Sequence, residues 1–459
     1  MGLLVLLYEE RFKMTVPDAP TAIFGLSALV IAVSVLLLVY VFIIWDRINQ
    51  TITALLGASA MLLFGVINHH AAMEGIDLNT IFLLVGMMVI VGMMQRTGLF
   101  QFVAILAAKS VKGNPRLILM LLSLITAVFS AFLDNVTTIM LIVPVTLLLT
   151  EQLKLPVYPF IFSQIFASNV GGTATLIGDP PNILLGSAVG LSFVDFMVNT
   201  GPVAVVCMLV LFVICDLIWG RKMVSSDRAR AHLQNYNPYE ALKDKVLLAK
   251  SLFVLALVLA GFILGHGTGL EPGSVALMGA AFLMLLDCYA HDSQKQTKKV
   301  HEAFGKVEWD AIFFFIGLFI IVTGVESTGL LSSLAHSLVG LTGGDLERTG
   351  YVILWGSALP SAFINNIPFV ATMIPLIQSM AVDMGGDEAI MPLWWALSLG
   401  ACLGGNGTLV GASANVMAAA YASRAGHAIS FVKFMLMALP LMAVTMAVAH
   451  VYMWLVYFK

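Results

Sequence analysis

Two twelve-residue stretches decide the fold: GGTATLIGDPPN at residues 171–182 and GGNGTLVGASAN at residues 404–415. They align position by position at an offset of 233, and each interrupts a long apolar segment, 157–198 and 393–423 respectively. Because glycine and proline disfavour the interior of a helix, neither segment can stay α-helical throughout. The sequence therefore predicts two broken helices, with breaks at 171–181 and 404–415.

The composition places these breaks in a membrane protein. Of the 459 residues, 60% are hydrophobic and only 11% are charged, whereas soluble domains are typically about a quarter charged. This composition excludes a soluble enzyme, a nucleic-acid-binding protein and a disordered protein. The four cysteines are dispersed through apolar runs and predict neither a zinc site nor a disulfide framework. No motif predicts a cofactor.

The repetition extends outward from the breaks. Residues 76–100 align without gaps with residues 307–331 at an offset of 231, which pairs Gly86 with Gly317. The same offset carries Asp134-Asn135 onto Asn365-Asn366. Polar residues that stay in register over several blocks indicate a duplicated unit. We expect an all-α polytopic membrane protein built from two repeats.

Lysine and arginine indicate which connections face the cytoplasm. Residues 221–245 carry six of them and residues 295–306 carry four lysines, whereas 69–79 and 266–271 carry none. The basic connections are therefore assigned to the cytoplasm and the N-terminus to the outside. Arg96 then marks the cytoplasmic end of its span, while its counterpart near Thr328 falls at the outer end. The two repeats are thus predicted to have inverted topology, as in many secondary transporters.

The predicted organisation follows from these assignments. It comprises an N-terminal segment 1–21, a first repeat 22–220, a basic cytoplasmic linker 221–245 and a second repeat 246–459. Segments near the roughly 20 residues that a membrane crossing requires are 22–45, 51–68, 80–94, 202–220, 246–265, 273–289, 311–325 and 434–456.

Two other apolar segments are too short to cross twice. Residues 116–149 are interrupted only by Asp134-Asn135, and two crossings need about 40 residues plus a turn. A re-entrant hairpin with its tip at 134–138 fits this length, and 351–380 repeats the pattern with a tip at 365–368. Because irregular backbone at membrane depth is tolerated only inside protein or beside a water-filled cavity, we expect both tips and both breaks to meet at one site.

The side chains available at that site are mostly amides and hydroxyls. The predicted substrate- or ion-binding residues are Asp134, Asn135, Thr137, Thr138, Thr173, Thr175, Asp179, Asn182, Asn365, Asn366, Asn406, Thr408, Ser413 and Asn415. Asp134 and Asp179 correspond to Asn365 and Ala412, so only the first half carries carboxylates. These two aspartates are therefore the predicted proton-coupling residues.

Simpler roles compete with these predictions. Helix capping is the alternative for each asparagine, and for Asp179, which precedes two prolines. Cys402 is a candidate thiolate ligand for a soft metalloid, although a lone buried thiol usually only packs. Apart from Cys402, no residue is predicted to bind a metal.

Four blocks carry a family resemblance: AFLDNVTT (131–138), NVGGTATLIGDPPNILL (169–185), FINNIPFVATMIPL (363–376) and GACLGGNGTLVGASAN (400–415). They resemble the ion transporter superfamily, in particular the branch of arsenite permeases, NhaD-type sodium–proton antiporters and P protein (pink-eyed dilution). The resemblance covers nearly the whole chain from about residue 22. It implies a scaffold domain, a transport domain with substrate between tips and breaks, and export coupled to the proton gradient.

Details of these blocks separate the branches. NhaD-type antiporters are similar at the first tip but depart after the Gly-Asp of the break, where this chain continues Pro180-Pro181-Asn182. Dicarboxylate carriers of the superfamily usually have Ser-Asn-Thr at the tip, whereas the tips here read Asp-Asn-Val and Asn-Asn-Ile. The resemblance therefore favours P protein and arsenite-permease relatives.

The leading functional hypothesis is arsenite or antimonite efflux from the cell (inner) membrane by proton antiport, because arsenous acid is neutral at pH 7 and suits amides and hydroxyls. A sodium–proton antiporter using Asp134 and an anion transporter like P-protein relatives are the alternatives. An intramembrane aspartyl protease is disfavoured, since Leu176 and Leu133 replace the glycine and tyrosine of its motifs. A homodimer and a soluble ATPase partner on 221–245 are both compatible with the sequence.

Overall fold

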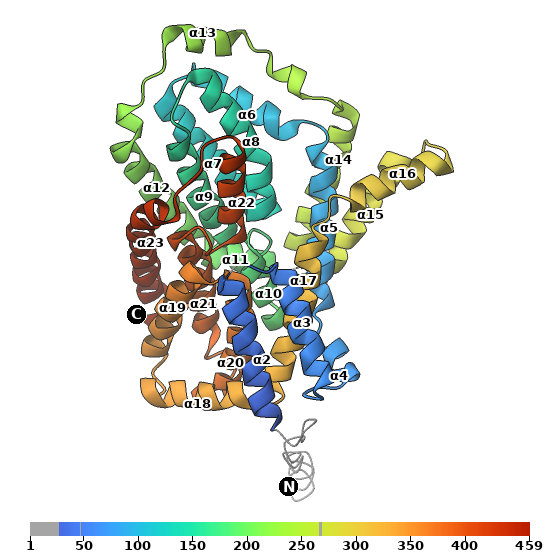
Figure 1. Ribbon diagram of the computed structural model, residues 1–459, viewed down its shortest axis with the longest axis vertical. Coiled ribbons are helices and arrows are strands. Elements are labelled where there is room, and N and C mark those ends of the chain that lie inside the picture. Colours follow the sequence, from blue (N-terminus) through green and yellow to red (C-terminus); the bar gives the residue numbers. More distant parts are fainter. Residues whose placement is uncertain (1–26, 46, 266–268) are drawn as a thin grey trace, which may run out of the picture.

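The computed structural model describes residues 27–45, 47–265 and 269–459, and in these residues the regular structure is helical (Figure 1). The segment predicted as 1–21 and the start of the first predicted span lie outside the described residues. The helices of the first half are α2 (Ala28–Trp45), α3 (Gln50–Leu63), α4 (His69–Glu74), α5 (Leu78–Gln95), α6 (Leu99–Ser110), α7 (Pro115–Leu133), α8 (Asn135–Leu153), α9 (Val157–Thr173), α10 (Pro180–Val189), α11 (Phe193–Asn199) and α12 (Gly201–Ile218).

The rest of the chain repeats this order after a polar connection. That connection contains η2 (Gly220–Lys222), α13 (Asp227–Asn235) and η3 (Pro238–Ala241). The helices that follow are α14 (Lys245–Gly265), α15 (Pro272–Cys288), α16 (Ser293–Phe304), α17 (Trp309–Glu326), α18 (Leu330–Thr342), α19 (Leu346–Phe363), α20 (Asn366–Met384), α21 (Met391–Gly404), η4 (Gly405–Gly407), α22 (Ser413–Arg424), α23 (Phe431–Met453) and η5 (Trp454–Phe458).

The described residues contain nine helices that are long and apolar enough to cross a membrane. Their outward faces carry large apolar side chains, such as Leu209 on α12 and Leu436 on α23, which are 57% and 67% exposed. Lipid favours such exposure, whereas water would oppose it. The chain is thus a multi-pass membrane protein, as its composition predicts.

The two repeats are inverted relative to each other. The matching helices α6 and α18 lie at opposite ends of the molecule, α6 near α13 and α18 at the end where α4 lies (Figure 1). The partners are also exchanged between repeats: α5 packs on α15, and α17 packs on α3. A Cβ at Gly86 would come within 2.5 Å of the Ala276 backbone, and one at Gly317 within 2.8 Å of the Ala54 backbone. The paired glycines therefore permit equivalent close contacts in the two halves.

Both predicted hairpins are present, with longer arms than the sequence predicts. The first runs from Pro115 to Leu153 and turns at Asp134, and the second runs from Leu346 to Met384 and turns at Ile364-Asn365. Each arm has 18 or 19 residues. The second hairpin begins five residues before its predicted start, after the cap Asp345, and both hairpins end four residues beyond the prediction, at the left-handed residues Lys154 and Gly385. Each hairpin nevertheless turns back beside a helix break.

Both predicted broken helices are also confirmed. The first breaks between α9 and α10, and the second breaks at η4 between α21 and α22. Within the first segment there is a further bend: Gly190 ends α10 with a positive φ of 73°, and α11 leaves at 116° to α10. Each half therefore contributes a hairpin tip and a backbone break to the centre of the molecule.

Candidate functional site

Close backbone contact holds each hairpin against its broken helix. A Cβ at Gly171 on α9 would lie 2.2 Å from the carbonyl oxygen of Ala127 on α7. Its counterpart Gly404 on α21 would meet the carbonyl oxygen of Ala358 on α19 at 2.5 Å. Only glycine allows backbones to approach this closely. The glycines of the quoted stretches thus set the distance between hairpin and break.

Hydroxyl groups reinforce the same contacts in both halves. Ser130 Oγ donates to the carbonyl of Ser168 at 2.6 Å, and Ser361 Oγ donates to the carbonyl of Ala401 at 2.6 Å. Thr175 and Thr408, both predicted site residues, donate from Oγ1 to the carbonyls of Ala131 and Ala362. Ala131 and Ala362 lie in the last turns of α7 and α19, whose carbonyls have no partner within the helix itself. Thr175 and Thr408 therefore brace the site.

Two asparagines hold the unwound backbone. Asn182 Nδ2 donates to the carbonyl of Thr175 at 3.0 Å, and Asn415 Nδ2 donates to that of Thr408 at 2.8 Å. Thr173 donates back to the carbonyl of Asn169 within α9 at 2.8 Å. Backbone that leaves the helix inside a protein needs such partners. These asparagines bond to the break, and neither is the helix N-cap.

Amide side chains connect the two breaks to each other. Asn169 Nδ2 on α9 donates to Asn406 Oδ1 at 3.0 Å and to Asn415 Oδ1 at 2.9 Å. In the other direction, Ser398 Oγ and Cys402 Sγ on α21 donate to Asn182 Oδ1, at 2.7 and 3.4 Å. The helix that precedes each break, α9 or α21, thus donates hydrogen bonds to the break of the opposite repeat.

The two aspartates have different roles in this arrangement. Asp134, at a φ of 110°, accepts the backbone N–H of Thr137 at 2.8 Å and caps α8. Asp179 is the N-cap residue of α10 but makes no capping hydrogen bond with its side chain. Its carboxylate instead accepts the Asn366 amide from the opposite hairpin, at 3.4 and 3.5 Å. Asp179 is therefore left available for other chemistry, and Asp134 is partly committed to its helix.

Several buried polar atoms at the first hairpin tip and the second break have no partner in the described part of the chain. Asn135 Oδ1, Thr138 Oγ1 and Asn406 Nδ2 form no hydrogen bond with the described residues. Asn135 Nδ2 donates a hydrogen bond to Asn169 Oδ1 at 3.3 Å, which leaves the Asn135 oxygen unused. Leaving a buried polar group unpaired is unfavourable. The set comprises an acceptor, a hydroxyl and a donor.

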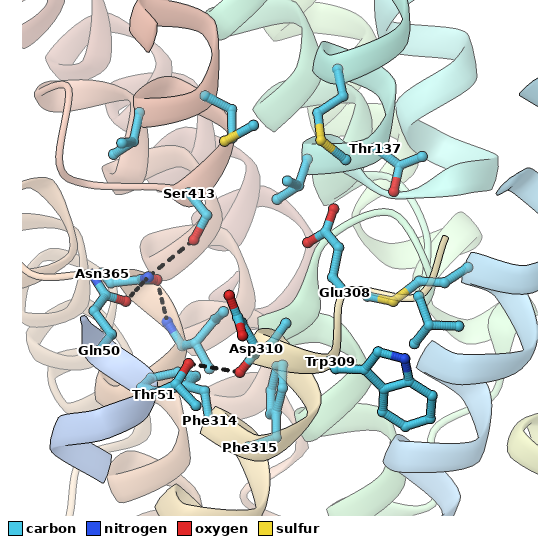
Figure 2. Close-up of a pocket in the computed structure, with 18 of the residues that line it drawn as sticks. Gln50, Thr51, Thr137, Glu308, Trp309, Asp310, Phe314, Phe315, Asn365 and Ser413 are labelled. Carbon is cyan, nitrogen blue, oxygen red and sulfur yellow. Dashed lines mark hydrogen bonds between the residues drawn. The ribbon is translucent and has the colours of Figure 1, made fainter. Parts of the chain in front are cut away.

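A cavity of about 870 Å³ lies beside this network, between α2, α3, α5 and α17 on one side and the hairpin tips and α22 on the other. Of the predicted site residues, Thr137, Asn365 and Ser413 line it, and the others lie behind its wall. Figure 2 shows the Asn365 amide between Ser413 and Gln50, to which it donates at 3.1 Å each. Asn365 also caps α20 by accepting the Ile367 N–H at 3.3 Å.

A smaller cavity of about 430 Å³ mirrors the first one. Positions that line the two cavities correspond at the repeat offsets: Met88 with Phe319, Glu308 with Asp77, and Met417 with Leu184. The larger cavity includes Gly305 and Lys306, next to α16, whereas the smaller one includes residues next to α4. Inverted repeats therefore form two unequal versions of one cavity.

Three residues that contact the site were missed from the sequence: Asn169, Ser398 and Gln50. Asn169 and Ser398 lie in the helical turns before the breaks, whereas the glycine and proline pattern indicates only the breaks themselves. A buried polar residue within an apolar membrane segment is itself a signal, and Asn169 meets that criterion. Gln50 comes from a different segment, and nothing in its local sequence points to the site.

Cys402 lies inside the protein, with its thiol on Asn182. No group of three or more His, Cys, Asp or Glu side chains suited to a metal ion occurs in the described part of the chain. The geometry gives the thiol one amide partner and no companion thiolate. Its assignment as a metalloid ligand stays a prediction.

Two inverted repeats with hairpins and broken helices, enclosing a polar site beside a cavity, define a membrane transporter. The chain belongs to the citrate transporter family (CitMHS), whose model matches residues 40–400. The expected place in the ion transporter superfamily is confirmed.

Relatives support the same class. An uncharacterized transporter of Mycobacterium tuberculosis is 43% identical over 433 residues, covering 94% of this chain and 99% of the relative. P protein of Homo sapiens is 31% identical over 504 residues, covering 92% of this chain and 59% of P protein. The expected likeness to P protein is therefore confirmed.

Solved transporters share the fold. The YdaH transporter of Alcanivorax borkumensis superposes with a TM-score of 0.56 at 12% identity, over 93% of this chain and 98% of that one. MtrF of Neisseria gonorrhoeae gives a TM-score of 0.57 at 11% identity, over 95% and 96%. At such identities the likeness concerns the fold.

Proposed function

We propose that this transporter exports a small neutral hydroxylated solute, arsenous acid or its antimony analogue, across the inner membrane in exchange for protons. The observation that carries the proposal is the mixed donor and acceptor character of three unpartnered groups: Asn135 Oδ1 and Thr138 Oγ1 at the first tip and Asn406 Nδ2 at the second break. A solute with several hydroxyls donates and accepts at once. It satisfies all three groups without introducing a charge.

The charges at the site support a neutral cargo over citrate, which the family description names. The segments 134–138, 171–182, 365–368 and 404–415 contain no Lys or Arg. A tricarboxylate moved into this site would lack the charge-assisted partners that carboxylates require when buried. The two aspartates would repel it further.

Coupling is assigned to the first half. Asp179 faces the amide of Asn366 and Asp134 caps α8, whereas Asn365 and Ala412 at the corresponding positions carry no charge. A carboxylate at membrane depth is expensive unless it has a functional partner. Protonation on one side of the membrane and release on the other would alternate with solute binding as the two unequal cavities exchange roles.

Everted membrane vesicles from a bacterium that lacks its own arsenite transporters test the proposal. We expect arsenite uptake that stops when a protonophore collapses the proton gradient. Uptake that persists without the gradient, or citrate uptake in place of arsenite uptake, would contradict it. Asp179→Asn should abolish the part of arsenite uptake that the proton gradient drives. Asp227→Asn should leave that part intact, because the Asp227 side chain on α13 is exposed.

A sodium–proton antiporter is the second candidate, because two carboxylates close to unpaired amide and hydroxyl oxygens also suit a hard cation. Sodium added to vesicles loaded with a pH-sensitive dye distinguishes the two. A sodium-driven dye response that disappears in Asp134→Asn would favour this alternative over metalloid export.

The thiol at Cys402 gives a sharper test of the cargo. Cys402→Ser keeps a donor to Asn182 and removes the sulfur ligand. If the solute is held by amides and hydroxyls alone, arsenite transport survives, as it does in the matched variant Cys207→Ser, whose thiol contacts only the Thr445 carbonyl at 3.8 Å. Loss in Cys402→Ser alone would assign a thiolate contact to the metalloid.

A further inference from the structure

Glu308 lines the larger cavity and takes no part in the transport mechanism proposed so far. Glu308 precedes α17, and the offset of 231 pairs it with Asp77, which precedes α5. Each occupies the N-cap position of its helix. The two residues therefore have the same place in the fold, one beside each cavity.

Asp77 is fully engaged by its own helix. Its carboxylate accepts the backbone N–H groups of Asn79 and Thr80 at 3.0 and 3.3 Å, and the Thr80 hydroxyl at 2.5 Å. This is the ordinary capping role of an aspartate. Its longer counterpart Glu308 makes no capping bond.

Glu308 instead extends into the cavity. Figure 2 shows its carboxylate directed away from α17 toward Thr137 in the first turn of α8. Its buried Oε1 has no hydrogen-bond partner among the described residues. The N-cap residue of α17 thus does not cap its helix, and its carboxylate faces the hairpin tip instead.

The surrounding charges favour a titrating group. Burial, together with the nearby carboxylates of Asp134 and Asp310, raises the pKa of Glu308, which lies outside the membrane-spanning α17, to about 7. The other ionisable groups that line the cavity are Lys306 and Tyr421 on α22.

We propose that Glu308 exchanges the coupling proton between the water of the larger cavity and Asp134 at the hairpin tip. This inference rests on the proton coupling proposed above and adds a residue to it. In the exchange, Asp134 loses the proton that the Glu308 carboxylate gains, and Glu308 then releases it to the cavity. Net charge over the pair is conserved in the first step.

The pH dependence of transport tests this role. Between about one pH unit below and one above its pKa, a single carboxyl group changes its ionised fraction about tenfold. We expect the uptake rate in everted vesicles, whose cytoplasmic face meets the bath, to follow this titration in the wild type. Glu308→Gln should flatten the profile, and Glu308→Asp should restore it. A Glu308→Gln profile like that of the wild type would overturn the proposal.

Asp77→Asn is the matched control. It removes a charge at the equivalent position of the other repeat, and it should leave the pH profile unchanged because Asp77 serves its helix. Gel filtration shows whether each variant folds. If Asp77→Asn flattened the profile as well, the assignment to Glu308 would be refuted.

A second measurement needs no transported solute, so it separates failure of this inference from failure of metalloid export. Dicyclohexylcarbodiimide modifies protonated carboxyl groups in apolar surroundings, and mass spectrometry locates the product. We expect labelling of Glu308 that declines as the pH rises through about 7, with Asp77 unlabelled. An unlabelled Glu308, or protection by sodium at constant pH, would overturn its role as a proton carrier.

Discussion

The two halves of the molecule share the architecture of their breaks and differ in the chemistry that the breaks carry. Gly171 and Gly404 allow the same backbone contact, and Asn182 and Asn415 hold the same carbonyls. At the positions between these anchors, Asp179 corresponds to Ala412. The residues that shape the break are thus alike in the two halves, whereas the carboxylate of Asp179 has no counterpart.

The difference extends to the partners of the aspartate. Asn366 directs its amide at Asp179, whereas the equivalent amide of Asn135 is bonded to Asn169. The first break therefore has a carboxylate with a donor, and the second has neither. A symmetric scaffold can thus hold an asymmetric site, in which the break of one repeat carries a carboxylate and the break of the other does not.

The largest expected effect comes from moving the charge between halves. Asp179→Ala should eliminate proton-driven uptake, and the double variant with Ala412→Asp should not recover it, because the amide of Asn135, the counterpart of Asn366, is bonded to Asn169. Everted vesicles with and without a protonophore give the measurement. Recovery in the double variant would show that the halves are interchangeable and would break the comparison.

The second effect concerns what the halves share. Gly171→Ala and Gly404→Ala each place a Cβ against a backbone carbonyl, and overpacking of this kind costs about 1–3 kcal/mol of stability. Thermal unfolding of the purified protein in detergent should show both variants destabilised. Gly356→Ala on α19 is the control, since its Cβ would meet nothing within 4 Å. If only one glycine variant lost stability, the shared architecture would be restricted to one half.

The smallest effect sharpens the same point. Ser130→Ala and Ser361→Ala each remove a hydroxyl bond of 2.6 Å to a helix carbonyl, and such bonds within membrane proteins contribute about 0.6 kcal/mol on average. Ser357→Ala, whose Oγ is buried without a partner, should be neutral or slightly stabilising. Unfolding in detergent measures all three. Unequal losses at Ser130 and Ser361 would separate the halves energetically.

Sequence reasoning predicted the breaks and hairpins because their signals are local. Glycine, proline and paired polar residues inside apolar runs define where the backbone must leave the helix. The register between the repeats follows from the direct alignment of their sequences. It set the hairpin arms too short, since their limits depend on the cap Asp345 at the start of the second hairpin and on the left-handed residues Lys154 and Gly385 at the ends of both. It also could not separate site residues that brace the backbone, such as Thr175 and Asn182, from those left unpaired.

The sequence by itself thus determined the class, the duplication, the inversion and the places where helices break, because composition and periodicity act on each segment separately. Only the tertiary structure decided which repeat supplies the partner of each polar group. Glu308 makes no capping hydrogen bond to its own helix. Asn169 donates to the break of the opposite repeat, and Asp179 accepts the amide of the opposite hairpin. These pairings join residues more than a hundred positions apart, and packing between the inverted repeats, which no local pattern encodes, brings them together.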